Sequence, residues 1–433
     1  MSGIGLPVAL VCVIGFLTIP RKWALLPVLV AALYVPASQE LEIGALHFTV
    51  LRLLVIAGVV RVISSGESMA GGLNYGDFLA VIWAVWAVFS SIFHREGVWL
   101  TRFGEIYTAL GLYYLFRVYL RSPEDFERLF KLLCLLFLPL AAAMLLEKLT
   151  FKNYFGPLFG RSGNPYLRHG NVRAFGPFVH PITAGTVGAV CLPMALYVWR
   201  LDRKLALAGL VGTGLVVFSS RSSGPILTTL SIFGGLALWR IRRQLRLVRW
   251  GVVILLVLIN FVMQDPIYYL IARIDLAGGS TGWYRANLIR AAIEHLGDWW
   301  LVGTDVTSNW AGANVINGTT DVDITNYYIR MGVNGGLPLM LLFIARLVAG
   351  FAGVGKTLSQ NQNAPREQQF LIWIMGSILL GHVVTFFSVA YFDPAAVLFL
   401  ELNLAAIGSA AACWNASPEE APVPIQGEVA VEA

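Results

Sequence analysis

The chain is poor in charged residues. Only 13% of its 433 residues are Asp, Glu, Lys or Arg, whereas 57% are hydrophobic. A soluble domain carries roughly a quarter charged residues, so this composition, with a mean hydropathy of +0.70, excludes that class and predicts a polytopic membrane protein. The net charge of +6 therefore gives no reason to expect nucleic acid as a partner. The positive charges have to be counted separately for the loops on each side of the membrane, because their distribution sets the orientation of the chain.

Motifs for nucleotides and metals are also missing. The sequence has no P-loop, no GxGxxG after a strand, no HExxH and no aspartate-rich metal motif. Residues 1–20 lack a basic region and a cleavage site, which argues against a cleaved signal. We therefore expect no cofactor and no metal. The cysteines lie in apolar runs without metal-ligand spacing and are interpreted as core residues. They are Cys12, Cys134, Cys191 and Cys413.

What the sequence does contain is a series of apolar runs of helix-spanning length. They predict an all-α polytopic membrane protein with twelve to fourteen transmembrane helices. The thirteen candidate runs are 4–20, 23–36, 50–64, 77–93, 100–119, 128–148, 179–199, 205–218, 223–239, 249–265, 326–346, 369–389 and 394–413. The predicted parts are N-terminal helices in 1–148, central helices in 149–265, a large loop at 266–325, C-terminal helices in 326–413 and a disordered tail at 414–433.

Lysine and arginine gather in alternate loops, the densest being RIRRQLRLVR at 240–249. By the positive-inside rule these loops are cytoplasmic, which puts the N-terminus outside and the C-terminus inside. The segments 149–178, 219–222 and 266–325 then lie outside. The last of them should contain a helix along the membrane surface, because WYRANLIRAAIEHL has apolar residues at near-helical spacing.

These outer segments contain almost no lysine but many arginines. Lys152 is their one lysine, and the arginines are Arg161, Arg168, Arg173, Arg221, Arg273, Arg285 and Arg290, with Arg330 following in the first turn of the next run. Arginine binds phosphate oxygens through a planar fork and stays charged. We therefore predict an anion site at the outer interface. Each arginine alone is also compatible with a lipid headgroup contact or an ion pair to Asp275, Glu294 or Asp298. Arg221 is the strongest candidate, because its turn FSSRSSGP contains no acid.

Possible proton carriers lie near these arginines. His180 in NVRAFGPFVHPITAG is a base or a sugar hydrogen-bond donor, or it only begins a helix. His295 ends the predicted surface helix, where a cation is favoured anyway. Asp321 and Asp323 precede the run that starts at 326 and are candidate general bases, with helix capping as the alternative.

A second set of residues at the same run points to substrate binding. Asn326 and Arg330 are four residues apart and share one helix face, where they would contact glycan or phosphate. Arg161, Arg168 and Arg290 are candidates for the same role.

Three of these segments together resemble the O-antigen ligase and Wzy-type polymerase superfamily. They are RAFGPFVHP at 173–181, SSRSSG at 219–224, and RANLIRAAIEHLGDWWLVGTD followed by NYYIRMGVNGGLPL. The resemblance implies a GT-C-like fold in the bacterial inner membrane, with the site facing the periplasm. It also implies a donor glycan on undecaprenyl diphosphate, whose diphosphate is bound by the residues matching Arg221 and Arg285, with Arg173 added here. Implied partners are the bilayer, a chain-length regulator and a flippase.

One position departs from the ligase branch. Ligases resemble H-N-x-x-L where this chain has TNYYI at 325–329, so Thr325 stands in place of the histidine thought to activate the acceptor. Threonine is no base near neutral pH, and we therefore favour a polymerase of lipid-linked repeat units, with a ligase as the alternative. A transporter of an anionic solute is the alternative from another class. The one-sided arginines, few ionisable residues in mid-span and no visible pair of broken helices favour the enzyme.

Overall fold

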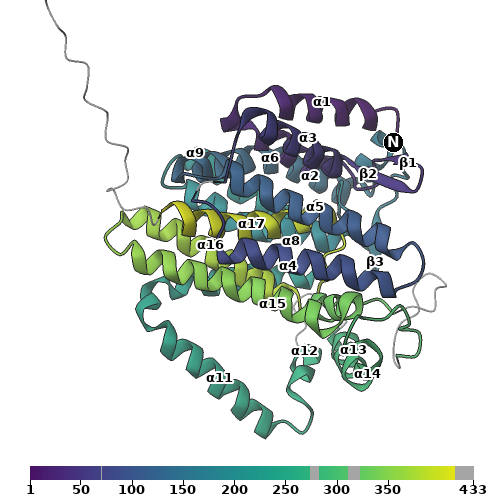
Figure 1. Cartoon of the computed structure of the whole chain (residues 1–433), viewed down its shortest axis with the longest axis vertical. Coiled ribbons are helices and arrows are strands. Elements are labelled where there is room, and N and C mark those ends of the chain that lie inside the picture. The colour runs from purple at the N-terminus through teal and green to yellow at the C-terminus, as the bar shows by residue number, and fades with distance from the viewer. Residues whose placement is uncertain (70, 274–281, 311–321, 415–433) are drawn as a thin grey trace, which may run out of the picture.

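The structure is a computed structural model that describes residues 1–69, 71–273, 282–310 and 322–414. Most of it is helical (Figure 1). The N-terminal helices are α1 (Gly5–Thr18), η1 (Arg21–Trp23), α2 (Leu25–Tyr34), α3 (Val50–Ser65), α4 (Tyr75–Ser90), η2 (Ser91–Phe93) and α5 (Val98–Tyr119). The central ones are α6 (Pro123–Thr150), α7 (Phe155–Leu158), α8 (Pro181–Val198), α9 (Arg203–Ser220), α10 (Ser223–Ala237), η3 (Leu238–Gln244) and α11 (Leu245–Val262). Then follow η4 (Ile267–Tyr269), α12 (Leu270–Arg273), α13 (Gly282–Glu294), α14 (Leu296–Trp299), α15 (Tyr327–Gln360), α16 (Arg366–Thr385) and α17 (Pro394–Cys413).

Every apolar run predicted to span the membrane coincides with a helix. Among the described residues, however, only eight helices are long and apolar enough to cross a bilayer, with α10 to α11 counted as one continuous helix. Helices α1, α2 and α3 have 14, 10 and 16 residues, fewer than the about 20 that a span needs. Helix α5 is long enough but carries Arg102, Glu105 and Arg117. The chain is a multi-pass membrane protein, and the expected count of twelve to fourteen crossings is not reached.

Two short β-hairpins were not predicted. They pair β1 (Glu40–Ile43) with β2 (Leu46–Thr49), and β3 (Tyr166–Arg168) with β4 (Asn171–Arg173). The second hairpin turns at His169 and Gly170, which both have positive φ, 48° and 73°. A two-residue turn of this kind matches the right-handed twist of the strands. Both hairpins lie at one end of the helix bundle, hereafter the loop end, together with α12, α13 and α14 (Figure 1).

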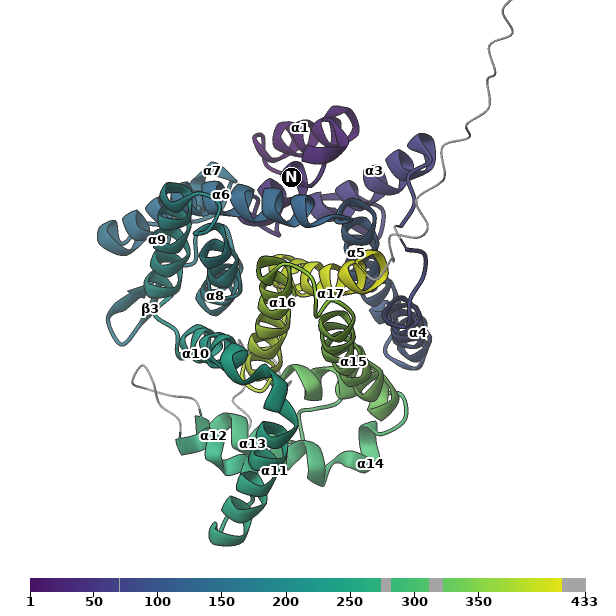
Figure 2. The same ribbon diagram turned by 90° about the vertical axis from the view of Figure 1, so that its left-hand side faces the viewer.

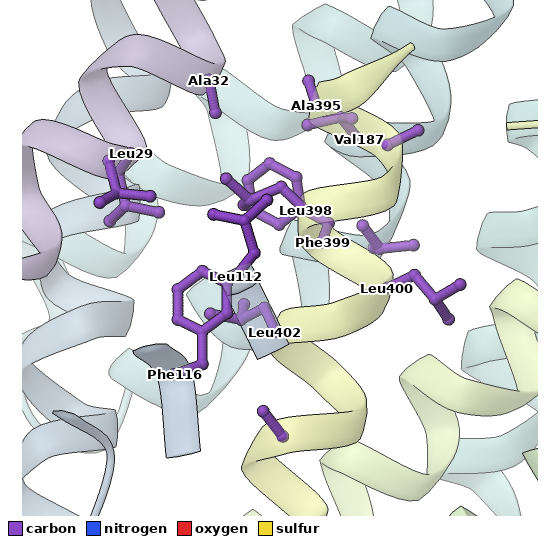
Figure 3. Packing of buried hydrophobic residues seen from close by; sticks show 14 of the residues in the cluster. Leu29, Ala32, Leu112, Phe116, Val187, Ala395, Leu398, Phe399, Leu400 and Leu402 are labelled. Carbon is purple, nitrogen blue, oxygen red and sulfur yellow. The ribbon is translucent and has the colours of Figure 1, made fainter. Parts of the chain in front are cut away.

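The core is a tight helix bundle in which α8, α16 and α17 are the most buried. Figure 2 views it from the end opposite the loop end, with α16 and α17 near its centre. Leu398, Phe399 and Leu402 of α17 are almost fully buried against helices that include Leu29 and Phe116 (Figure 3). Helix α11 differs, because none of its residues is buried and it leaves the bundle (Figure 1). An apolar helix exposed on all sides belongs in lipid.

The bundle contains more buried charge than the sequence analysis indicated. Arg346 of α15 forms a two-armed ion pair with Glu401 of α17, with Nη1–Oε1 and Nη2–Oε2 distances of 3.2 and 2.6 Å. Arg117 of α5 bonds both carboxylate oxygens of Asp77 in α4, at 2.9 and 3.0 Å. These two pairs place charge inside the bundle, which the count of ionisable residues in mid-span did not anticipate. Paired charges of this kind satisfy one another and escape a count of apolar runs.

Candidate functional site

The β3–β4 hairpin gathers polar side chains on one of its faces. Tyr166 pairs with Arg173 and Arg168 with Asn171. Side chains directly opposite in an antiparallel pair share a face, and so do alternate residues of a strand. All four therefore point to one side. The sequence analysis selected the two arginines from their charge, but it missed the hairpin that aligns them.

This face contacts the turn between α9 and α10, which carries Arg221. The Nη2 of Arg173 donates to Ser222 Oγ at 2.5 Å, and the Nη1 of Arg221 donates to Asn171 Oδ1 at 2.6 Å. The backbone N–H of Ala174 donates to the carbonyl of Ser219 at 3.0 Å. Two segments about fifty residues apart in the chain, Asn171–Ala174 and Ser219–Ser222, are thus held together, as the two predicted arginine motifs required.

Arg221 is exposed and adopts the left-handed backbone conformation, with φ 42° and ψ 52°, at the C-terminus of α9. A non-glycine residue in this region carries strain that the surrounding structure must support. The conformation ends α9 and lets α10 begin at Ser223, while the guanidinium turns toward the hairpin. Packing leaves little room beneath the turn, because a side chain at Gly185 of α8 would collide with Ser220 and Pro225.

Arg285 joins the cluster from α13 in the large loop. Burial lowers the pKa of Arg285, and the positive charge of Arg168, which lies within electrostatic range, lowers it further. Burial likewise lowers the pKa of Arg173, with a further contribution from Arg168. The Nε atoms of Arg173 and Arg285 are buried and have no hydrogen-bond partner. We call these arginines the arginine cluster: Arg168, Arg173, Arg221 and Arg285.

Three arginines of the cluster lack a carboxylate partner among the described residues. In the described part of the chain, no carboxylate forms an ion pair with Arg173, Arg221 or Arg285. Lys148 adds a further positive charge, which lies within electrostatic range of Arg221. Like charges held together repel one another unless an anion joins them. The unpartnered buried donors of Arg173 and Arg285, and the lack of a carboxylate partner for these two arginines and for Arg221, together make the arginine cluster a candidate anion site.

His180 stands at the border of the cluster as the N-cap of α8, where its Nδ1 accepts from the N–H of Ile182 at 3.1 Å. A neutral imidazole that accepts at Nδ1 carries its proton on Nε2. Burial lowers the pKa of His180 to about 4, and the charges of Arg173 and Arg168 add to this effect. His180 is therefore neutral at physiological pH and suited to donate from Nε2, and it begins a helix as the alternative interpretation predicted.

Asp323 lies just before α15 and is exposed. Desolvation of its carboxyl group raises the pKa of Asp323, while the positive charge of Arg330 acts in the opposite direction. Tyr284, the neighbour of Arg285 in α13, donates its hydroxyl to the Asp323 backbone carbonyl. This bond ties the helix that carries Arg285 to the entrance of α15. Asp321, the other acid considered, lies outside the described residues.

A cavity of about 90 Å³ lies at the loop end between the N-terminal helices α3, α4 and α5 and the C-terminal helices α15 and α17. Arg330 lines it, and so does Phe392, whose ring lies 6.3 Å from the ring of His180. Arg52, Arg102 and Glu105 also line it. The sequence analysis missed these residues because they belong to N-terminal helices that it treated only as membrane spans.

Several predicted site residues lie elsewhere. Asn326 is the buried N-cap of α15, where its Oδ1 accepts from the N–H of Ile329 at 3.1 Å. His295 stacks on Trp310 and lies 3.1 Å from the carboxylate of Asp298. The structure thus uses Asn326 and His295 in capping and packing and does not bring them to the arginine cluster.

The two remaining arginines also lie apart from the cluster. Arg290 forms an exposed ion pair with Glu294 at 3.7 Å. Arg161 is exposed after α7, next to a segment in which the carbonyl of Phe159 accepts from Gln39. Of the arginines proposed to contact glycan or phosphate, the structure places Arg168 in the cluster and Arg330 at the cavity.

The hairpin β1–β2 brings together three possible metal ligands that the sequence analysis did not select. Glu40, Glu42 and His47 place one ligand atom each within 4.8 Å of one another. They pair across the hairpin, with Glu42 opposite His47. Exposed acidic groups of this kind are common without a metal, and we assign no ion to them.

A break in α15 explains the glycine pattern GVNGGL. Gly336 has φ 76° and ψ −178°, and a side chain there would collide with the backbone of Leu301. The carbonyl of Trp300 accepts from the N–H of Leu337 at 2.7 Å. The turn after α14 therefore docks against the break and fixes the first turns of α15, which carry Arg330. The sequence analysis saw the glycines but expected an unbroken span.

Comparisons with protein-family models and with curated proteins find no match to this chain. The fold and composition define its class as a multi-pass membrane protein. Its family is not shown.

Proposed function

We propose that the protein is a membrane glycosyltransferase that polymerises lipid-diphosphate-linked oligosaccharides, with the arginine cluster as the site of the diphosphate. The observation that carries this proposal is the cluster itself. The hairpin and the turn bind each other through their arginines, Arg285 of a third segment lies within electrostatic range of Arg168, and two buried nitrogens of the cluster lack a partner. A diphosphate supplies the oxygens and the negative charge that such a site needs.

The reaction we propose is a displacement at the anomeric carbon of the donor sugar. A hydroxyl oxygen of the acceptor bonds to that carbon, and the bond from the carbon to the diphosphate oxygen breaks. The diphosphate leaves with the electron pair. Arg173, Arg221 and Arg285 would stabilise the negative charge that develops on the diphosphate. Such stabilisation by preorganised hydrogen-bond donors is usually the largest single contribution to catalysis.

The acceptor hydroxyl must lose its proton. We assign this proton to the carboxylate of Asp323, which lies near Arg330 and is exposed enough to pass the proton to water. His180 is less suited, because its Nδ1 is occupied by the N–H of Ile182. Its Nε2–H would instead donate to an oxygen of the diphosphate or of the sugar next to it.

The side of the membrane follows from charge. The loop end carries the arginine cluster, whereas RIRRQLRLVR lies between α10 and α11 at the opposite end. Met1 bonds to Glu40 at the loop end, and Trp414 packs on Phe126 near the start of α6 at the other. By the positive-inside rule the site would face the periplasm of a bacterial inner membrane.

The test uses the purified protein and an undecaprenyl-diphosphate-linked oligosaccharide. We expect longer lipid-linked chains, which are lost in Arg221→Ala and kept in Arg290→Ala, whose exposed arginine lies outside the cluster. In cells, loss of a polymerase leaves single repeat units on the lipid. Loss of a ligase, the alternative with the same donor, leaves full-length polymer on it.

A second candidate, transport of an anionic solute, is favoured by the ion pair of Arg346 and Glu401 inside the bundle. Intramembrane charges commonly mark a substrate or proton path. Uptake of a solute by vesicles containing the protein, together with no elongation of lipid-linked saccharide, would support transport and exclude the enzyme.

A further inference from the structure

The cavity between the two halves of the bundle has an unusual lining for a membrane protein. Three guanidinium groups, those of Arg52, Arg102 and Arg330, face a single carboxylate, that of Glu105. The Arg102–Glu105 contact is long, at 3.9 Å. The described lining therefore carries more positive than negative charge, at a place that is distinct from the arginine cluster.

The carboxylates near the cavity are already engaged. Asp305 influences Arg102, but its oxygens bind the Nδ1 of His94 and the N–H of Arg95, both at 2.6 Å. Glu40, which influences Arg52, lies 3.4 Å from His47. Neither acid lines the cavity, so neither balances its charge from within.

Two buried donors at the cavity wall have no partner. They are the Nε of Arg102 and the Nε1 of Trp83. Arg330 forms no ion pair with any carboxylate of the described chain. Buried polar groups are rarely left unpaired in native proteins. Their presence beside an arginine-rich cavity indicates a ligand that accepts hydrogen bonds and carries negative charge.

The cavity also has groups suited to a sugar. Phe392, which is 43% exposed, provides aromatic surface, and Asn334 offers an amide. Phe392 stands between the cavity and His180, which belongs to the border of the arginine cluster. Arg330 joins the cavity to Asp323, the proposed base. An acceptor in the cavity would thus lie beside the base and near the donor.

From this arrangement we infer that the cavity binds a carboxylate-bearing sugar of the acceptor chain, so that the enzyme prefers to extend an acidic polysaccharide. This inference rests on the proposed function and names the substrate class of the same site. Arg102 and Arg330 hold the carboxylate, and the sugar ring lies against the exposed side chain of Phe392. Glu105 limits the affinity, because its charge opposes that of the ligand.

The experiment measures binding of tri-galacturonate to the purified full-length protein in lipid nanodiscs by calorimetry. Its trimethyl ester is the neutral control with the same sugar skeleton. We expect tri-galacturonate to bind at least about tenfold more tightly than the ester, which corresponds to about 1.4 kcal/mol. Arg102→Gln and Arg330→Gln should each remove about tenfold of the affinity, as expected for a lost charge-assisted hydrogen bond. Arg290→Gln should change nothing.

Glu105→Gln is expected to raise the affinity, an effect that misfolding cannot produce. Removing the one carboxylate of the lining should increase the affinity for tri-galacturonate several-fold and leave binding of the ester unchanged. Equal binding of the two saccharides overturns the inference. The inference also fails if the affinity for tri-galacturonate is unchanged in the variants of Arg102, Arg330 and Glu105.

Inorganic pyrophosphate separates this inference from the proposed function. We expect pyrophosphate to bind at the arginine cluster, with a loss of affinity in Arg221→Ala and none in Arg102→Gln. If its binding depends on Arg102 instead, the cavity is a second diphosphate site and the inference fails. If Arg221→Ala leaves pyrophosphate binding unchanged while Arg102→Gln weakens tri-galacturonate binding, the proposed role of the arginine cluster is wrong. The inference about the cavity is then still supported.

Discussion

Arg173 and Ser222 are joined by a hydrogen bond of 2.5 Å between the arginine Nη2 and the serine Oγ. The bond turns the guanidinium toward the α9–α10 turn and leaves its buried Nε without a partner. Beside it, Arg221 reaches back to Asn171 at 2.6 Å. The hairpin and the turn thus fix each other's arginines, and the donors are in place before any ligand arrives.

Arg173→Gln should weaken binding of undecaprenyl diphosphate by about tenfold to a hundredfold, the loss expected for a hydrogen bond to a charged group. Ser222→Ala should weaken it less, because the charge remains and only its orientation is relaxed. The measurement is a binding isotherm with the purified protein. Arg161→Gln, at an exposed arginine outside the cluster, is the matched control. An Arg161 effect as large as that of Arg173 would mean that general surface charge is responsible.

The pH dependence of turnover distinguishes the two candidate proton carriers. Asp323 acts as a base only when deprotonated, so the rate should fall on acidification through its pKa. Desolvation raises this pKa and Arg330 opposes the rise, so the net change places the fall above the usual value for aspartate of about 3.9. Burial and the charges of Arg173 and Arg168 lower the pKa of His180 to about 4, so no step is expected near the usual histidine value of about 6.5.

The test records kcat from pH 4 to pH 9. Asp323→Asn should lower kcat by about 10²–10⁴-fold, the usual contribution of a general base, and should remove the acidic limb. An acidic limb that persists in Asp323→Asn and disappears in His180→Gln would instead assign the proton to His180.

Gly336 and Gly355 offer a matched pair of substitutions in one helix. Gly336 has a positive φ and touches the Leu301 backbone, whereas a side chain at Gly355 would meet open space. Gly336→Ala should destabilise the protein by about 1–3 kcal/mol through backbone strain, and more if the Leu301 segment must shift. Gly355→Ala should be neutral or stabilising by up to about 1 kcal/mol from helix propensity.

Thermal melting in detergent checks both glycine variants, and elongation activity should fall only in Gly336→Ala, because Arg330 lies in the helix turns that the break positions. Equal stability of the two variants would show that the break is not a structural requirement.

The sequence allowed a good prediction of where helices lie. A long apolar run in a membrane has to pair its own backbone N–H and C=O groups, and a helix does so within one segment. The sequence was less informative about which of these helices cross the membrane in contact with lipid. Helix α11 is exposed on all sides, whereas α8 is almost entirely buried, yet both are apolar runs of 18 residues. Apolarity does not distinguish lipid from protein as a neighbour.

The arginines of the cluster could be selected from the sequence because their segments were predicted to lie outside, where basic residues are normally few. The cavity could not be predicted, because Arg52, Arg102 and Glu105 acquire meaning only when α3 and α5 pack against α15. His180 shows a third case. Its type and position were noticed, but the proton on Nε2 follows from a backbone hydrogen bond that only the folded chain provides.

Arg346 and Glu401 test how far buried charge stabilises the bundle. Both side chains are 2% exposed and their closest atoms are 2.6 Å apart. Removing one partner leaves the other charge buried and unpaired, which typically costs about 3–5 kcal/mol. Arg346→Met and Glu401→Leu should therefore each lower the melting temperature strongly. The double variant should recover most of the loss, because two apolar side chains of similar volume pack without a charge.

The exposed pair of Arg200 and Glu367 is the control. Its atoms lie 3.1 Å apart with 45% and 59% of the side chains exposed, and surface pairs contribute about 0–1 kcal/mol. Arg200→Ala should hardly change the melting temperature. Recovery of stability in the Arg346→Met, Glu401→Leu double variant, with elongation intact, assigns the buried pair to structure. Recovery of stability with loss of elongation would instead show that the buried pair also contributes to the reaction.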